Sequence, residues 1–340
     1  MITRKESNMK IIKKIFKTLL LILFTLIFLA LLVWSVLNIV KYFMYPDYYH
    51  NAKIISEIPS LNEGFVPQGL DYDPETKTYI HSGYHGKNIE LYFVTDSVPK
   101  TIIPLNPDGT RATGHGGGTT RAGDYLYICN NEGNSNGRPG QLHVFKFDEL
   151  WNATNGTGVK SIGTLSVDTS SDFCFSDDKF IYVGEFYRAV DYETAESHYY
   201  TTPAGDENKA ILSAYPLNAD GSINGTYPAF SVSITSQVQG FAITEDGKVM
   251  LSRSWGLNPS YLEIHSGMKD SGKTINVSGK KVPLFYLDST TRVQNITMPA
   301  FSEGLTIVND KVAISFESAA KKYIVGEFFF AYNVVSYPIN

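Results

Sequence analysis

One pattern recurs five times between residues 67 and 318, and it restricts the possible folds more than any other feature of the sequence. Each copy has a small polar entry, an apolar run, a tight polar turn, a second apolar run and a polar cluster. Two short apolar runs around such a turn predict a β-hairpin. The copies are PQGLDYDPETKTYIHSGY (67–84), HGGGTTRAGDYLYICNN (115–131), SDFCFSDDKFIYVGEF (171–186), VQGFAITEDGKVMLSRSW (238–255) and SEGLTIVNDKVAISFES (302–318).

Further strand-like segments follow each hairpin. We predict third strands at NIELYFVT, GQLHVFKFD, AILSAYPL, VPLFYLD and EFFFAYNVV, and fourth strands at KTIIPL, SIGTLSV, AFSVSIT and RVQNITM. Past residue 50 almost no stretch has a 3.6-residue apolar period, so the region is all-β. Four strands per unit, repeated five times at spacings of roughly 50 to 70 residues, predict a five-bladed β-propeller.

The fifth unit has no fourth strand of its own after its third. The segment AKIISEIPSLNEGFVPQG (52–69) instead matches the fourth-strand context RVQNITMPAFSEG (292–304). We therefore predict that this N-terminal strand closes the last blade, which removes the sheet edge that a linear repeat would expose. A β-sandwich would not explain the displaced strand, whereas six blades remain possible if residues 256–300 hide a degenerate unit.

Residues 18–40 carry no charge and are numerous enough to cross a bilayer as one helix. Six basic residues and one acidic residue precede this stretch, which predicts a cytoplasmic N-terminus and a propeller outside the cytoplasm. A cleaved signal peptide is the alternative, but the apolar stretch is longer than usual and no small-residue cleavage site follows it. The predicted organisation is a basic tail (1–17), an anchor (18–40), a short linker (41–51) and the propeller (52–340).

The predicted outer region is acidic. Six of the 29 basic residues and one of the 34 acidic residues precede residue 41, so the remainder carries a net charge of about −10. This charge argues against nucleic acid or an anionic membrane surface as a partner. The two cysteines, Cys129 and Cys174, lie in apolar runs and could equally form one disulfide or remain buried thiols.

Polar residues gather where the inner strands of the propeller begin. Strand directions alternate, so these beginnings and the ends of the second strands lie on one face and ring the mouth of the central channel. The 1-2 turns are short, whereas the 2-3 loops of blades 3 (188–209) and 4 (256–281) are predicted to be long and to elaborate this face. A concave mouth with converging polar and aromatic groups is the default binding site. The predicted ligand-binding residues are Gln68, His115, Asp172, Glu185, Gln239, Arg253, Trp255, Glu303 and Glu317, beside Glu132, Ser254, Tyr84, Phe186, Tyr187 and Tyr323.

Several chemistries are compatible with this mouth. Asp172 and Glu303, with Glu317 as a further candidate, offer hard oxygen ligands for calcium or magnesium, and a metal-dependent hydrolase could use His115 as its base. Zinc at His81, His85 and His115 is a weaker alternative, because their spacing places them together only on a helix. A glycosidase needs a carboxyl pair at a defined separation, and the first inner strand begins with Gln68 instead of an aspartate.

The segments VPQGLDYD, GHGGGT, YVGEF, VQGFAITEDGKVMLS and EGLTIVNDKVAISFESAAKKY resemble those of a group of bacterial secreted or membrane-anchored five-bladed β-propeller proteins. The resemblance covers roughly residues 60 to 325, and FESAAKKY is its most distinctive part. The Glu-Gly and Gln-Gly strand entries are more distantly similar to those of gluconolactonase-type propellers, in which a glutamate at such an entry binds a divalent metal. Only Glu303 matches that role directly. The resemblance therefore supports the predicted fold strongly and a particular reaction hardly at all.

The predicted function is binding of a surface glycan, a small polar ligand or a protein partner by a membrane-anchored propeller. A divalent-metal-dependent hydrolase of lactonase or glycosidase type is the first alternative, with Glu303 and Asp172 as metal ligands. A scaffold for assembly, with no ligand in the channel, is the second. Whether the protein is an enzyme stays open at this point.

Overall fold

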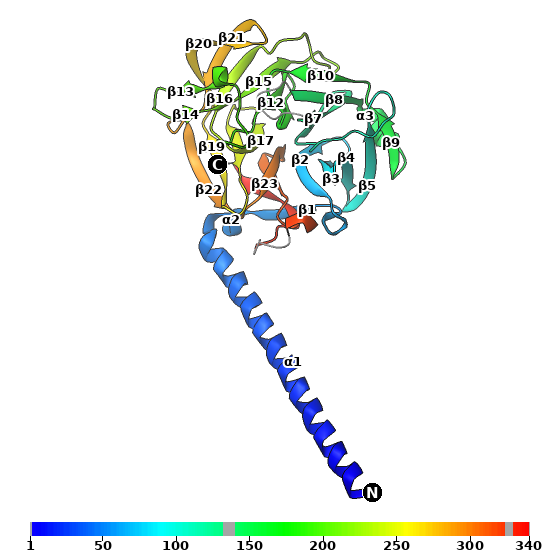
Figure 1. Cartoon of the computed structure of the whole chain (residues 1–340). Helices are drawn as coiled ribbons and strands as arrows, with labels where there is room; N and C mark the ends of the chain where they lie inside the picture. The colour runs from blue at the N-terminus through cyan, green and yellow to red at the C-terminus, as the bar shows by residue number, and fades with distance from the viewer. Residues whose placement is uncertain (1, 132–139, 324–328, 340) are drawn as a thin grey trace. The chain divides into compact units, whose positions relative to one another are not determined.

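A computed structural model describes residues 2–131, 140–323 and 329–339 of the 340-residue chain. It divides into two compact units, residues 1–49 and 50–340. The second unit is a five-bladed β-propeller, in which antiparallel sheets stand around a common centre (Figure 1). The fold predicted from the repeat is therefore confirmed.

The first unit is helical. Helix α1 (Ile2–Met44) is followed, after Tyr45, by the first residues of α2 (Pro46–Asn51), so that most of the segment expected as a linker is helical. Proline lacks an N–H and disfavours a helical conformation in the residue before it, which explains the break at Tyr45. The part of α1 from Met9 to Met44 is long and apolar enough to cross a membrane, although a signal sequence would have the same properties.

Each blade has four main strands, numbered outward from the channel. Blade 1 consists of β2 (Val66–Asp73), β3 (Thr78–His85), β4 (Asn88–Thr95) and β5 (Val98–Leu105). Blade 2 consists of β6 (Thr119–Ala122), β7 (Tyr125–Asn130), β8 (Gly140–Lys146) and β10 (Gly163–Val167). Blade 3 consists of β11 (Phe173–Ser176), β12 (Phe180–Gly184), β15 (Ala210–Pro216) and β16 (Phe230–Ile234).

Blade 4 consists of β17 (Val238–Ile243), β18 (Val249–Arg253), β19 (Ser260–His265) and β22 (Arg292–Met298). Blade 5 consists of β23 (Ser302–Val308), β24 (Lys311–Phe316), β25 (Asn333–Pro338) and β1 (Lys53–Glu57). The short elements are the 3-10 helices Leu61–Glu63, Glu196–His198 and Lys321–Tyr323 and the two-residue strands β13 (Tyr200–Thr201) and β14 (Glu207–Asn208).

The N-terminal strand closes the ring. β1 pairs antiparallel with β25, with Lys53 opposite Ser336 and Glu57 opposite Asn333. The predicted closure is thus confirmed, although the third strand of blade 5 begins later than EFFFAYNVV (327–335) suggested; residues 327 and 328 lie outside the described residues. Closure leaves the last sheet with four strands and ties the two ends of the propeller together.

Glycines bring the inner strands together around the channel. A Cβ on Gly304 would lie 2.5 Å from the backbone nitrogen of Leu70, and one on Gly69 would lie 2.6 Å from that of Thr119. A Cβ on Gly240 would come within 2.7 Å of the Glu303 carbonyl oxygen. These contacts join neighbouring blades, so only glycine allows the strands to approach this closely.

The sequence misassigned blade 4. VPLFYLD was predicted as its third strand, but its first five residues belong to β21 (Lys280–Tyr286). This strand forms a hairpin with β20 (Lys269–Val277) and pairs parallel with β16 of blade 3. The third strand is β19 instead, so the 2-3 loop spans only residues 254–259, and no sixth blade forms in residues 256–300. The reason is chemical: β19 contains the buried polar residues Glu263 and His265, which concealed its strand pattern.

Two connections cover the outer edge of the preceding blade. In blade 2, the path from β8 to β10 passes through α3 (Phe147–Asn152) and β9 (Thr157–Lys160), which pairs parallel with β5 of blade 1. The β20–β21 hairpin of blade 4 covers blade 3 in the same way. Covering an edge strand removes a surface on which another chain could add a strand.

Candidate functional site

The inner strands begin with β-bulges at three of the predicted mouth residues. The pairing register shifts between Pro67 and Gly69, between Val238 and Gly240, and between Ser302 and Leu305. Gln68, Gln239 and Glu303 therefore lie outside the regular ladder. A bulge turns its side chain away from the normal pleat, and bulges are common beside functional sites.

A hydrogen-bonded cluster lies where blades 1 and 5 meet at this end. The Gln68 amide donates to Glu317 Oε2 at 2.7 Å, and Glu317 also shares hydrogen bonds with Glu303 and Tyr323. Glu303 and Glu317 are both buried, with 2% and 6% of their surface exposed. We call Gln68, Tyr84, Glu303, Glu317, Lys322 and Tyr323 the mouth cluster.

The two carboxyl groups of the mouth cluster do not ionise independently. Burial and the adjacent charge of Glu317 hold the pKa of Glu303 well above its usual value. Burial also raises the pKa of Glu317 to about 7, against the lowering effects of Lys322, Tyr323 and Gln68. Two touching, buried carboxyls resist being ionised together, so the pair carries at most about one negative charge near neutral pH.

Lys322 and Tyr84 complete the cluster. The Lys322 ammonium donates to the Tyr84 hydroxyl at 2.6 Å, and Tyr84 also hydrogen-bonds with Tyr323. The ring of Tyr84 lies 4.9 Å from that of His115, centroid to centroid. His115 is exposed at its surface, yet partial desolvation and the charge of Lys322 lower its pKa, so its imidazole is neutral at pH 7.

Asp172 belongs to a neighbouring group. It accepts hydrogen bonds from Asn131 Nδ2 at 2.8 Å, from the Phe186 backbone N–H at 2.7 Å and from the Ser170 hydroxyl. Burial raises its pKa, and these donors oppose the shift. The charge of Asp172 opposes the lowering of the pKa of His115, and the His115 ring lies beside Tyr84 of the mouth cluster.

The remaining predicted residues have other partners. Glu185 accepts a hydrogen bond from His198 Nδ1 at 2.9 Å and another from the Ile211 N–H. Arg253 pairs with the buried Glu263 at 2.5 Å. Gln239 is half-buried, and Glu132 lies outside the described residues.

An aromatic rim borders the mouth at blades 3 and 4. The rings of Phe186 and Tyr192 lie 5.8 and 5.7 Å from that of Trp255, and the Arg188 guanidinium covers Trp255 at 4.2 Å. Tyr192 has 45% of its surface exposed. Phe186 joins this rim to Asp172, because its backbone N–H donates to the Asp172 carboxylate.

The two predicted metal ligands have different hydrogen-bond partners. Glu303 contacts Glu317, whereas Asp172 is held by Asn131, Ser170 and Phe186. His81 is buried without a hydrogen-bond partner, and burial lowers its pKa to about 3. Across residues 9–131, 140–323 and 329–339, no three His, Cys, Asp or Glu side chains are arranged to hold a metal ion.

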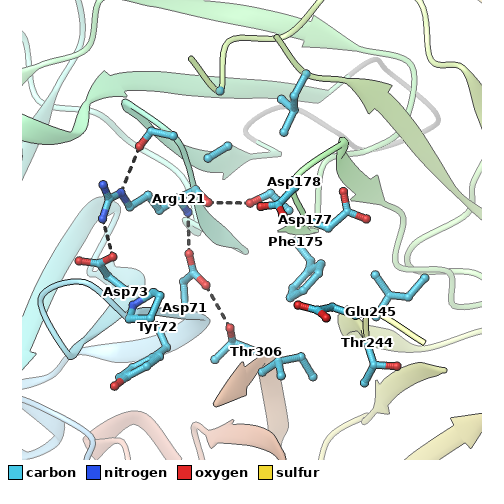
Figure 2. Close-up of a pocket in the computed structure, with 18 of the residues that line it drawn as sticks. Asp71, Tyr72, Asp73, Arg121, Phe175, Asp177, Asp178, Thr244, Glu245 and Thr306 are labelled. Carbon is cyan, nitrogen blue, oxygen red and sulfur yellow. Dashed lines mark hydrogen bonds and ion pairs between the residues drawn. The ribbon is translucent and has the colours of Figure 1, made fainter. Parts of the chain in front are cut away.

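The opposite end of the channel contains a pocket of about 1060 Å³. It is lined by the ends of the inner strands and the turns after them, and Figure 2 shows its carboxyl groups. Asp71 accepts hydrogen bonds from the Arg121 N–H at 2.5 Å and from Thr306 at 3.0 Å, and burial raises its pKa to about 6. The Arg121 side chain pairs with Asp73 and Glu75.

Sequence reasoning missed several of these residues. Lys322 stands in the distinctive FESAAKKY segment but was not singled out, and His198 lies in a loop of unassigned role. The far pocket was missed entirely. Its signal was the polar alternation DYD at the end of the first inner strand and Thr306 inside an otherwise apolar run.

No protein-family model and no curated protein matches the sequence. Among solved structures, the PQQ-bound aldose sugar dehydrogenase of Streptomyces coelicolor is 12% identical over 84% of this chain and 96% of that chain, with a TM-score of 0.46. A Thermus thermophilus protein described as a glucose dehydrogenase is 10% identical over 84% and 98% of the chains, with a TM-score of 0.40. A luciferin-regenerating enzyme is 11% identical over 84% and 96%, with a TM-score of 0.39. Such values are too low to assign any property of these enzymes to this chain.

Proposed function

We propose that the chain is a membrane-anchored binding protein with its propeller outside the cytoplasm, and that a neutral, hydroxyl-rich ligand such as a surface glycan binds at the channel mouth. The observation that carries the proposal is the mouth cluster, in which a buried carboxyl pair, an amide, two phenols and an ammonium group converge. Converging polar groups beside aromatic surface are the usual composition of a small-ligand site.

The charge of the cluster favours a neutral ligand. The Glu303–Glu317 pair carries at most about one negative charge near neutral pH, and Lys322 lies close enough to Glu317 to offset it. A ligand with its own charge would meet no unbalanced opposite charge and would still lose its hydration. Hydroxyl groups both donate and accept hydrogen bonds, which matches the mixture of donors and acceptors at the mouth.

The aromatic rim supports a ring-shaped ligand. The C–H faces of a sugar ring are apolar, so they lose little when they pack against an exposed aromatic side chain such as Tyr192. Because Phe186 connects this rim to Asp172, a glycan could place hydroxyls at the axis and a ring face at the rim.

Binding is better supported than hydrolysis. Glycosidases hold their two carboxyl groups at least about 5 Å apart so that the sugar bond fits between them. Glu303 and Glu317 instead contact each other through a hydrogen bond. The geometry thus suits recognition more than cleavage.

The placement outside the cytoplasm follows from the basic residues that precede the apolar helix. External protease added to intact spheroplasts that contain the full chain should digest the propeller. Protection of the propeller from the protease would contradict this placement.

A glycan array probed with the detergent-solubilised full chain tests the ligand class. We expect a small set of neutral glycans to bind, and the variant Gln68→Ala/Glu317→Ala to lose those signals while keeping its circular dichroism spectrum. If no glycan binds the wild type, or if the variant binds the same set equally well, the proposal is wrong.

A further inference from the structure

The two cysteines of the chain lie together although 44 residues separate them in sequence. Cys129 lies in β7, the second strand of blade 2, and Cys174 lies in β11, the inner strand of blade 3. Both are thiols in the structure, with 0% and 5% of their surface exposed. They belong to one apolar cluster between the two blades, and the Cys174 thiol contacts both the side chain and the backbone of Cys129.

Gly118 produces this contact. The Cys129 N–H donates to the Gly118 carbonyl oxygen at 2.8 Å, which fixes Cys129 beside it within blade 2. A Cβ on Gly118 would lie 2.4 Å from the Cys174 backbone nitrogen, so the missing side chain lets blade 3 approach. Cys129 and Cys174 therefore both lie against the backbone of Gly118, and this proximity brings their thiols into contact.

Other roles for this pair have less support. A nucleophile or a redox sensor needs an accessible thiolate, whereas burial and the neighbouring Cys129 raise the pKa of Cys174 well above its usual value. No third ligand for a metal lies with the pair among residues 9–131, 140–323 and 329–339. A pair of adjacent cysteines stays reduced in a reducing compartment, whereas disulfides form and persist outside it.

We propose that Cys129 and Cys174 form a disulfide that joins blades 2 and 3, an inference that rests on the proposed placement of the propeller outside the cytoplasm. One S–S bond forms and two S–H bonds are lost. Two electrons and two protons pass to the disulfide of a thiol oxidase, which leaves as a dithiol. The exchange precedes the docking of the two blades, since the folded structure excludes an oxidase from both thiols.

The disulfide would close a loop of about 46 residues that contains the outer half of blade 2. A cross-link of this length restricts the unfolded chain and stabilises the fold, with an expected gain in Tm of roughly 5–10 °C. The disulfide would also stabilise the mouth, because Asn131 follows Cys129 closely in sequence and donates a hydrogen bond to Asp172, which lies near Cys174.

Differential alkylation of the exported full chain tests the proposal. The protein is denatured in iodoacetamide without reductant, then reduced and treated with N-ethylmaleimide before mass spectrometry. We expect N-ethylmaleimide on both cysteines. Iodoacetamide on both would overturn the disulfide.

Thermal unfolding provides a second measurement. Reductant should lower the Tm of the wild type by roughly 5–10 °C and should leave Cys129→Ala/Cys174→Ala unchanged. An equal effect of reductant on both proteins, or no effect on either, would count against the disulfide. Protease protection in spheroplasts decides the placement separately, so free thiols on a digestible propeller would refute the disulfide and leave the proposed function standing.

Discussion

The two ends of the propeller channel are lined by the same five inner strands, but their carboxyl groups differ in burial and in interaction partners. At the mouth, Glu303 and Glu317 are buried and hydrogen-bonded to each other, their pKa values are raised, and Lys322 lies close to Glu317. At the far end, Arg121 neutralises Asp73, whereas Asp178 and Glu245 are exposed to solvent in a wide pocket. Burial and hydrogen-bond partners, more than the number of acidic residues, therefore determine what a site can bind.

The largest effect is expected from the glycines that hold the mouth together. Gly304→Ala would place a Cβ 2.5 Å from the Leu70 backbone nitrogen, so blades 1 and 5 would have to separate. We expect a loss of about 3 kcal/mol in the free energy of unfolding, measured by urea denaturation. Gly163→Ala in β10 is the matched control, because no atom lies within 4 Å of its added Cβ.

The pH dependence of stability should separate the two ends. The pKa of Glu317 is about 7 in the folded protein against 4.5 ordinarily, so the folded state binds this proton more tightly. Its contribution is complete below pH 4.5 and is lost as the pH rises through 7, up to about 3 kcal/mol at 1.36 kcal/mol per pKa unit. Asp71, with a pKa of about 6 against 3.8, gives the same sign over a lower pH range.

Urea denaturation between pH 4 and pH 8 measures both contributions. Glu317→Gln should flatten the profile between about pH 4.5 and pH 7, and Asp71→Asn should flatten it between about pH 4 and pH 6, so only the Glu317 variant changes the slope between pH 6 and pH 7. If Asp71→Asn changes that part of the profile and Glu317→Gln does not, or if stability rises with pH, the assignment of a raised pKa to Glu317 is wrong.

Loss of an arginine side chain should lower the free energy of unfolding by different amounts at the two ends of the channel. Arg121→Ala would leave the buried Asp73 without a cationic partner, at a cost of about 2 kcal/mol, since Arg121 is itself partly exposed. Arg253→Ala should cost about half as much, because Glu263 keeps Arg292 at 2.9 Å and His265 at 3.4 Å. Chemical denaturation of both variants at pH 7 gives the comparison, and equal losses would contradict it.

The smallest effect is expected from exposed acids at the far end. Asp178→Asn/Glu245→Gln should change the free energy of unfolding by no more than about 0.5 kcal/mol, and the change should disappear at high salt, where such charges are screened. A larger effect that persists in salt would show that these carboxylates have partners inside the pocket.

Structural features that depend on short sequence patterns were predictable, whereas features that depend on side-chain contacts between distant strands were not. Hairpins and the glycines at the axis follow from patterns within a few residues, and the closing strand follows from matching those patterns between repeats, so they were predictable. The third strand of blade 4 was not, because Glu263 is buried in it only by virtue of Arg253 and Arg292 from other strands.

The same limit applies to the site. The convergence of Gln68, Glu303 and Glu317 was predicted from strand order, since each begins an inner strand or ends the next one. The hydrogen bond of Lys322 to Tyr84 joins residues 238 positions apart, and no periodic pattern in the sequence predicts such a contact. The far pocket is likewise assembled from turns of all five blades.

Calorimetric titration of a glycan selected on the array compares the two ends most directly. Three proteins are needed: the wild type, the mouth variant Glu303→Gln/Glu317→Gln and the far-end variant Asp178→Asn/Glu245→Gln. We predict that the mouth variant weakens binding at least about 100-fold, because each lost charged hydrogen bond costs roughly 1.5–3 kcal/mol, and that the far-end variant stays within about twofold. Loss of affinity in the far-end variant with retention in the mouth variant would contradict the account.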